Sequence, residues 1–175
     1  MSRSLRMLAL IAPLIAVGGC GDDSTDPVVG LDAFIGTYAI DPTVQVNCTI
    51  GDFGSAQLSV DTIEVTDASD DSLYLRVPFR VTTSVLGEID TDADAQFAVA
   101  VTGDGGFAGS SPLAVSIPLG PTFVNGEGLV AIGGEFADED AFSAEVTASF
   151  NTWIGSGEET PCTPVALDVS GTRVD

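Results

Sequence analysis

The sequence predicts an all-β fold: an antiparallel meander of about seven to nine strands that closes into a small barrel. From residue 36 onward, apolar and polar residues alternate with a period of two, as in strands with one buried face. Short segments rich in Gly, Asp, Ser and Pro separate the alternating stretches, and no helical periodicity follows the first twenty residues. The stretches are consecutive and about ten residues long, which favours a closed barrel over the alternative, a two-sheet sandwich.

The alternation is clearest in 73–81, where every odd position is apolar. Pro78 lies on the outward face of this strand and has no N–H to donate, so we expect an edge or a bulge there. Between Val60 and Ile63 the apolar parity slips by one residue, which predicts a bulge near Asp61. Similar alternation is found in 44–50, 97–101, 113–119, 142–150 and 165–169. The predicted turns are 67–72, 87–94, 103–106, 120–122, 133–140 and 155–161.

The first twenty residues have the pattern of a secretory signal peptide. Arg3 and Arg6 precede an apolar run, Met7–Val17, which is followed by two glycines and Cys20. The run is too short for a membrane-spanning helix, which needs about 20 residues. The motif Val-Gly-Gly-Cys at 17–20 resembles the lipobox of bacterial lipoproteins. An ordinary cleaved signal and an uncleaved anchor are the alternatives.

The lipoprotein resemblance implies a three-part organisation: signal peptide 1–19, a lipidated cysteine with a flexible acidic tether 20–30, and one β domain 31–175. Cys20 would carry a diacylglycerol thioether and an N-acyl chain such as palmitate, and two or three acyl chains hold a protein firmly on a membrane. Gly21, rather than Asp, follows the cysteine. In lipoproteins of double-membraned bacteria this favours transport to the outer membrane, with the periplasmic or surface face left open.

The composition excludes several classes of function. The chain carries 26 acidic and five basic residues and no histidine, for a formal charge of −21. Removal of residues 1–19 leaves three basic residues against the same acids, a charge of −23, which repels nucleic acid and anionic lipid head groups. Without histidine or lysine, the Ser-His and Cys-His nucleophile systems and the phosphate-binding P-loop are impossible. We therefore expect no enzyme and no nucleic-acid partner.

With Cys20 assigned to lipid, two cysteines remain. In an exported chain an even number of cysteines predicts a disulfide, and only Cys48 and Cys162 can form it. Closing a loop of more than 100 residues stabilises a fold by up to about 4–5 kcal/mol on the entropic model. The alternative is two unpaired buried thiols. A zinc site is a poorer explanation, because two thiols without histidine leave zinc under-coordinated.

One acidic stretch is a weak calcium candidate. Its acids, Asp90, Asp92 and Asp94, match the first half of an EF-hand loop. The match then fails, because Ala95 and Val101 stand where the loop glycine and the bidentate glutamate belong. A calcium site at this turn, or at the acidic turn 138–140, is kept as the alternative to a solvated acidic turn. We expect no cofactor other than the covalent lipid.

The segment 34–38, Phe-Ile-Gly-Thr-Tyr, resembles the Gly-x-Trp signature on the first strand of lipocalins, with Tyr38 in place of tryptophan. Arg173 lies in the last strand, where lipocalins place an arginine that packs across that aromatic residue. The resemblance implies a barrel with an interior pocket for an apolar ligand. The alternative is a first strand with an ordinary aromatic core residue.

The sequence also predicts the surroundings of three further side chains. Arg76 and Arg80 share one strand face and are expected to pair with carboxylates on neighbouring strands, such as Glu64, in preference to binding an anion. Trp153, the single tryptophan, is expected to cap the core or rim a pocket.

The sequence thus predicts a non-enzymatic envelope lipoprotein, held at the membrane through Cys20, whose acidic β domain is a structural or interaction and binding module. The alternative is a lipocalin-like carrier of an apolar small ligand. The sequence names neither a protein partner nor a ligand.

Overall fold

The computed structural model describes residues 30–69, 72–89, 93–102, 105–119 and 122–175. In this part of the chain, eleven strands form one antiparallel sheet, and two short 3-10 helices precede and follow the first strand. The strands are β1 (Gly36–Thr49), β2 (Ser55–Ala68), β3 (Ser72–Pro78), β4 (Arg80–Thr83), β5 (Gly87–Ile89), β6 (Asp94–Val101), β7 (Gly106–Leu119), β8 (Thr122–Asp138), β9 (Ala141–Ile154), β10 (Thr160–Pro161) and β11 (Val165–Arg173). The 3-10 helices are η1 (Leu31–Phe34) and η2 (Gly51–Phe53).

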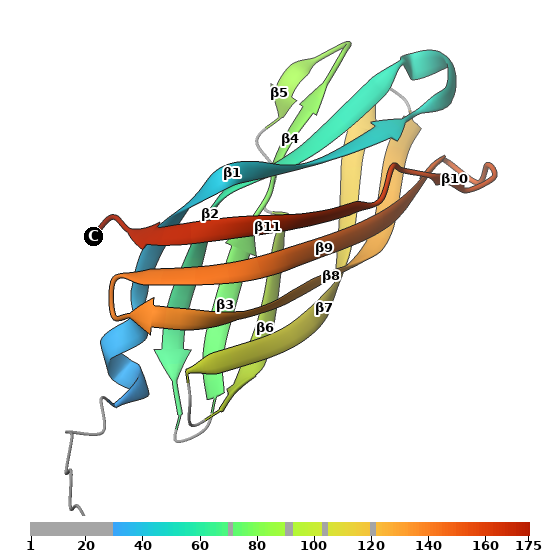
Figure 1. Cartoon of the computed structure of the whole chain (residues 1–175). Helices are drawn as coiled ribbons and strands as arrows, with labels where there is room; N and C mark the ends of the chain where they lie inside the picture. Colours follow the sequence, from blue (N-terminus) through green and yellow to red (C-terminus); the bar gives the residue numbers. More distant parts are fainter. Residues whose placement is uncertain (1–29, 70–71, 90–92, 103–104, 120–121) are drawn as a thin grey trace, which may run out of the picture.

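Eight of these strands close into an antiparallel barrel, which confirms the predicted fold class. The strand order is β1-β11-β9-β8-β7-β6-β3-β2, and β2 pairs back with β1. Strands β4 and β5 continue β3 and β6 beyond the closed part and form a hairpin at the edge of β2. We call the two ends of the barrel the η1 end and the disulfide end. Figure 1 shows η1 below the barrel, with η2 and the β4–β5 hairpin at the opposite end.

The predicted bulge near Asp61 is present. In the register of β1 and β2, Ala39 faces Thr62 while Val44 faces Val60. Four residues of β1 therefore lie opposite Asp61 alone, and most of the irregularity is on β1. Such a bulge bends the strands and increases their twist, which helps a sheet to close on itself.

The predicted strand 73–81 is interrupted near its proline. Pro78 is the last residue of β3, and β4 begins two residues later. Between them, the N–H of Phe79 donates to the carbonyl of Ala93 at 2.8 Å. The missing N–H of proline explains the break. The predicted turn 87–94 is partly wrong, because β5 occupies its first three residues.

The predicted turn 133–140 is also wrong over most of its length, because β8 continues to Asp138. Glycines and acids there suggested a turn. In the structure Gly134 lies in the ladder opposite Ala144, and a Cβ at Gly134 would be 2.1 Å from the carbonyl oxygen of Ser143. A glycine inside a strand marks this kind of close backbone approach.

The seam between β6 and β7 is short. Its register covers Ala100 with Ala108 and Val101 with Phe107. Farther toward the disulfide end, the described part of β7 pairs with β8 alone. Pro112 and Pro118 lie in this stretch, an even number of positions apart and therefore on the same face of the strand. Prolines are common on edge strands, because they have no N–H with which a further strand could pair.

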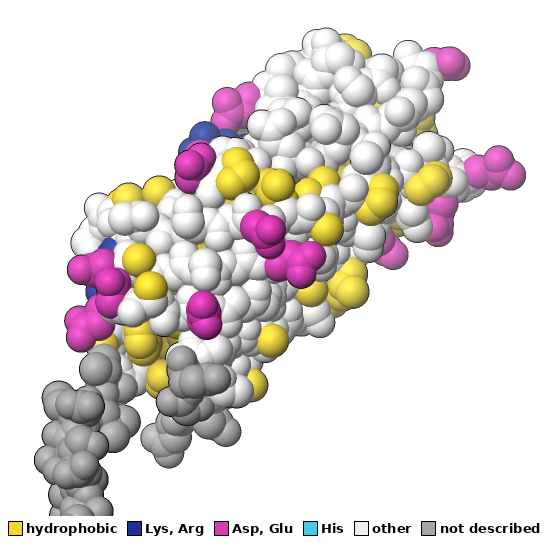
Figure 2. Space-filling view, viewed as in Figure 1, with side chains coloured by type: hydrophobic (Ala, Val, Ile, Leu, Met, Phe, Trp, Pro, Cys, Tyr) yellow, Lys and Arg dark blue, Asp and Glu magenta, His cyan; other side chains and the backbone are white. Residues whose placement is uncertain are grey.

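The core fills the barrel with the inward-facing residues of every long strand. Aromatic rings gather at the η1 end, where the centroids of Phe34 and Phe136 are 4.3 Å apart and those of Tyr38 and Phe142 are 5.5 Å apart. On the face shown in Figure 2, acidic side chains are spread over the surface and few basic ones accompany them.

Candidate functional site

The barrel interior is the site that the lipocalin resemblance predicts, and in this structure it is a packed core. It contains a cavity of about 20 Å³ near the disulfide end. Residues of five strands line it, among them Cys48, Leu58, Ile117 and Phe150. Sites for drug-sized ligands have volumes of about 300–1,000 Å³. The cavity is large enough for roughly one water molecule, so it is no carrier pocket in this conformation.

Phenylalanine rings that lie over glycines account for the filled interior. Phe142 faces Gly171 across the β9–β11 ladder, and Phe150 faces Gly128 across the β8–β9 ladder. A Cβ at Gly171 would be 2.1 Å from the ring of Phe142, and one at Gly128 would be 2.4 Å from the ring of Phe150. The glycines therefore make room for the rings, which occupy the space that a ligand would need.

At the η1 end, the aromatic and arginine residues of the lipocalin resemblance lie together. Tyr38 is fully buried, and its hydroxyl is shared between the carbonyls of Phe34 (2.9 Å) and Glu139 (2.8 Å). Arg173 is its register partner on β11, with the guanidinium carbon 5.9 Å from the centre of the Tyr38 ring. Burial raises the pKa of Tyr38, and the charge of Arg173 opposes that rise. The phenol is therefore a neutral donor at physiological pH.

Arg173 also fastens η1 to the barrel. Its Nη1 donates to the carbonyl of Ala33 at 3.0 Å, its Nη2 donates to the carbonyl of Ile35, and Nη1 lies 3.6 Å from the Asp140 carboxylate. These contacts hold the ring of Phe34 against the aromatic cluster. The η1 end of the barrel is closed by this arrangement.

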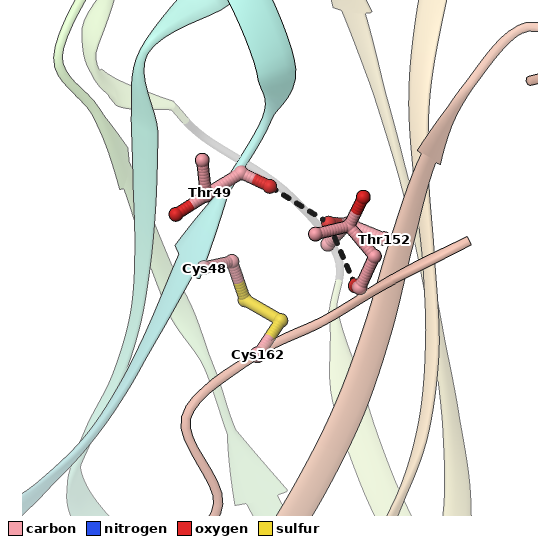
Figure 3. The surroundings of a disulfide bond; sticks show 5 residues. Cys48, Thr49, Thr152 and Cys162 are labelled. Carbon is pink, nitrogen blue, oxygen red and sulfur yellow. Dashed lines mark hydrogen bonds between the residues drawn. A yellow bond between two sulfur atoms is a disulfide. The ribbon is translucent and has the colours of Figure 1, made fainter. Parts of the chain in front are cut away.

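At the other end, Cys48 and Cys162 form the predicted disulfide, with a Cα–Cα distance of 4.3 Å (Figure 3). Both residues are buried, at 2% and 6% exposure. Beside the bond, the hydroxyl of Thr152 is shared between the carbonyls of Thr49 (3.3 Å) and Thr160 (3.4 Å). The bond joins β1 to the segment before β11. Because both cysteines are used in the disulfide, neither has a free thiol to bind a metal ion.

The calcium candidate is only partly within the described residues. Asp90 and Asp92 lie outside them. The Oδ2 atom of Asp94 accepts hydrogen bonds from Nε of Arg76 (2.7 Å) and Nε2 of Gln96 (2.9 Å). The hydrogen bond from Arg76 is the main cause that lowers the pKa of Asp94. Among the described residues, no three acidic or cysteine side chains are placed to hold a metal ion.

Arg76 and Arg80, which were expected on one strand, lie on β3 and β4, and both form the expected cross-strand ion pairs. Arg76 bridges Asp94 and Glu64, with a distance of 3.0 Å to the latter. Arg80, at the start of β4, lies 2.9 Å from Asp61. The guanidinium groups are therefore paired with carboxylates of neighbouring strands, as expected.

Trp153 is half-buried and lines a surface pocket of about 200 Å³ beside η2 and the segment before β10. It therefore rims a pocket and does not cap the core. Cys20 and the predicted signal peptide lie outside the described residues.

Two grooves on the outer surface were not predicted from the sequence. One, of about 440 Å³, crosses β2, β3 and β6 and contains Tyr74 and Asp67. The other crosses β7, β8, β9 and β11 and contains Glu135, Glu145 and Asp168. Tyr74 was visible as an aromatic residue at an outward position of 73–81, but its neighbours on β2 and β6 depend on the strand register.

Comparison with known proteins leaves the family open, because no family model, curated protein or solved structure matches the chain. None of the helices in the described ranges is long and apolar enough to cross a membrane.

Proposed function

We propose that the protein is a lipid-anchored, non-enzymatic module of a bacterial envelope, which acts by binding a partner on the outer surface of its barrel. The lipobox-like motif that ends at Cys20 supports the anchor, and Gly21 supports an outer-membrane location. The absence of histidine and lysine from the sequence supports a role without nucleophilic catalysis.

The filled interior is the observation that carries this proposal. The interior cavity beside Cys48 has a volume of about 20 Å³, which is too small for a ligand of useful size. The η1 end is covered by η1, which Arg173 holds to the barrel, and at the other end the disulfide ties β1 to the segment before β11. The outer surface of the barrel is then the place where a partner can be recognised.

A second candidate, a lipocalin-like carrier of an apolar ligand, is favoured by one specific observation. Arg173 packs across Tyr38 beside the helix that closes the barrel, which is the arrangement that the lipocalin resemblance implies. This function requires a different packing of the interior, with the rings of Phe142 and Phe150 turned aside.

Mass spectrometry separates the two functions. The protein is purified from membranes in a nonionic detergent, and non-covalent molecules are extracted with organic solvent, which leaves lipid on Cys20 in place. A binding module is expected to release nothing in stoichiometric amount beyond bulk membrane lipid. One apolar molecule per chain, enriched over the membrane composition, would establish the carrier and refute the module.

The anchor has its own test. Replacement of Cys20 by alanine is expected to release the protein from the membrane fraction or to block its processing. Replacement of Ser24 by alanine, in the predicted tether, is the matched control and should leave both unchanged. A Cys20→Ala protein that is still processed and still pellets with membranes would show that lipid on this residue is not the anchor.

A further inference from the structure

The groove across β2, β3 and β6 has the features of a site for a cationic group. Tyr74 is 43% exposed, although it lies in the middle of a barrel strand. Its register partners are Asp67 on β2 and Ala98 on β6. Side chains directly opposite one another in an antiparallel pair have Cβ atoms about 4.5–5.5 Å apart. The residues that flank Tyr74 on the neighbouring strands are therefore Asp67, next to a bulge in β2, and Ala98.

Asp67 differs from the other carboxylates near this face in having no basic partner among the described residues. The three described arginines pair with other acids, two of them on this same face of the barrel. Asp67 accepts one local hydrogen bond, from the N–H of Ala68 at 2.8 Å. Gln96 also lies in the groove. Its side-chain N–H donates a hydrogen bond to Asp94, and its amide oxygen remains available as an acceptor.

We propose that this groove binds a lysine or arginine side chain in a basic segment of a polypeptide partner. The cation would lie against the ring of Tyr74, with Asp67 beside it and the amide oxygen of Gln96 as a further acceptor. A cation over an aromatic face, next to a carboxylate, gains from both contacts. The inference rests on the proposed binding function and names its partner class.

Charge complementarity supports a basic polypeptide. The formal charge of −21 attracts basic partners over a distance and repels acidic ones. The second groove is more acidic, since Glu145 and Asp168 are direct register partners, but none of its lining residues is aromatic. Acidic side chains alone attract counter-ions without selecting one. The combination of Tyr74 and Asp67 is what makes the first groove selective.

The test uses the full chain in nonionic detergent and a capped synthetic peptide in which three arginines alternate with glycine, with affinity measured by calorimetry. We expect Tyr74→Ala and Asp67→Asn each to weaken binding by about two- to fivefold. Tyr74→Phe keeps the aromatic face and should retain the wild-type affinity. In NMR spectra of the wild type, the ring protons of Tyr74 should shift on titration.

Two controls separate a site from general attraction. Glu145→Gln removes the same charge from the other groove and should leave the affinity unchanged. A peptide with neutral citrulline in place of arginine should not bind. The proposal is overturned by absence of binding, by equal binding of the citrulline peptide, by wild-type affinity in Tyr74→Ala, or by equal losses in Glu145→Gln and Asp67→Asn. None of these outcomes bears on Cys20 or on an interior ligand, so the failures of the two proposals are distinguishable.

Discussion

Joint replacement of Cys48 and Cys162 by alanine is expected to lower the free energy of unfolding by about 3–5 kcal/mol. The bond lies where the barrel closure is weak. The register between β1 and β11 ends at Asp41 and Ser170, and the remainder of β1 toward η2 pairs only with β2. One backbone hydrogen bond, from Thr163 to the carbonyl of Asn47, also joins β1 to the segment before β11. The disulfide therefore links β1 to the segment before β11 in a region where β1 and β11 no longer pair.

The magnitude follows from the length of the closed loop. The two cysteines are 114 residues apart, and the chain-entropy model gives about 5 kcal/mol for a loop of that length at 25 °C. Strain in the native state lowers this value, and loss of two buried sulfur atoms beside an existing cavity raises it. For a domain of this size, each kcal/mol shifts the melting temperature by about 2–4 °C, so we expect a fall of roughly 6–20 °C.

Urea unfolding, followed by the fluorescence of Trp153 and by far-UV circular dichroism, measures this change. The wild type under reducing conditions, unfolded and refolded, should lose most of the same stability, because it lacks the cross-link, and should remain slightly more stable than the double variant, because it keeps the two buried sulfur atoms. The urea m-value should also rise, since an unfolded chain without the cross-link exposes more surface. A loss below about 1 kcal/mol, with the bond verified in the wild type by mass spectrometry, would refute the loop-closure argument.

Three further changes test the packing and the electrostatics. Gly134→Ala should destabilise the protein by about 1–3 kcal/mol, because its Cβ would lie 2.1 Å from a backbone oxygen. Gly133→Ala is the control and should change stability little, because the nearest atom there is 3.8 Å away. Equal effects of the two variants in urea unfolding would contradict the close-approach argument. Gly126→Ala places a methyl group in ordinary contact at the lining of the interior cavity and should stabilise by about 0.5–1 kcal/mol, and a loss of stability there would mean that the cavity is not free space. The hydrogen bond from Arg76 lowers the pKa of Asp94, so this pair stabilises the fold above the ordinary aspartate pKa of about 3.9 and loses that effect as the pH falls through the lowered value. The deficit of Asp94→Asn in urea unfolding should therefore be present near neutral pH and vanish in strong acid, and a deficit independent of pH would exclude the ion pair as its cause.

Alternation along the chain predicted the all-β fold and the closed barrel, but not the short strands β5 and β10, which lie in predicted turns. It identified the bulge near Asp61, and the count of cysteines identified the disulfide. It failed at 133–138, where glycines inside β8 have the composition of a turn. A glycine that permits a turn and a glycine that permits close packing look alike in a sequence, because the second depends on which residue faces it across the sheet.

The same dependence on register explains why the packed interior was not predicted. Phe142 and Gly171 are 29 positions apart in the chain, and nothing local indicates that β9 and β11 place one over the other. The pairing of Arg76 with Glu64 was predicted because their strands are consecutive, whereas its second partner, Asp94, belongs to β6 and was missed as a partner. Contacts between consecutive strands can be predicted from the alternation, whereas contacts that depend on the register of strands farther apart in the chain cannot.

Barrel closure and a ligand pocket are separate properties, and this chain shows how they diverge. Eight strands enclose a volume that side chains can fill or leave for a small ligand. Here the rings of Phe142 and Phe150 lie opposite glycines, so that each ring extends across its neighbour without a clash. A carrier needs the reverse, with large side chains withdrawn from the centre. The Tyr38–Arg173 contact closes one end in either case. The resemblance at that contact therefore bears on how the barrel is closed, and the glycine–phenylalanine pairs bear on what it can hold.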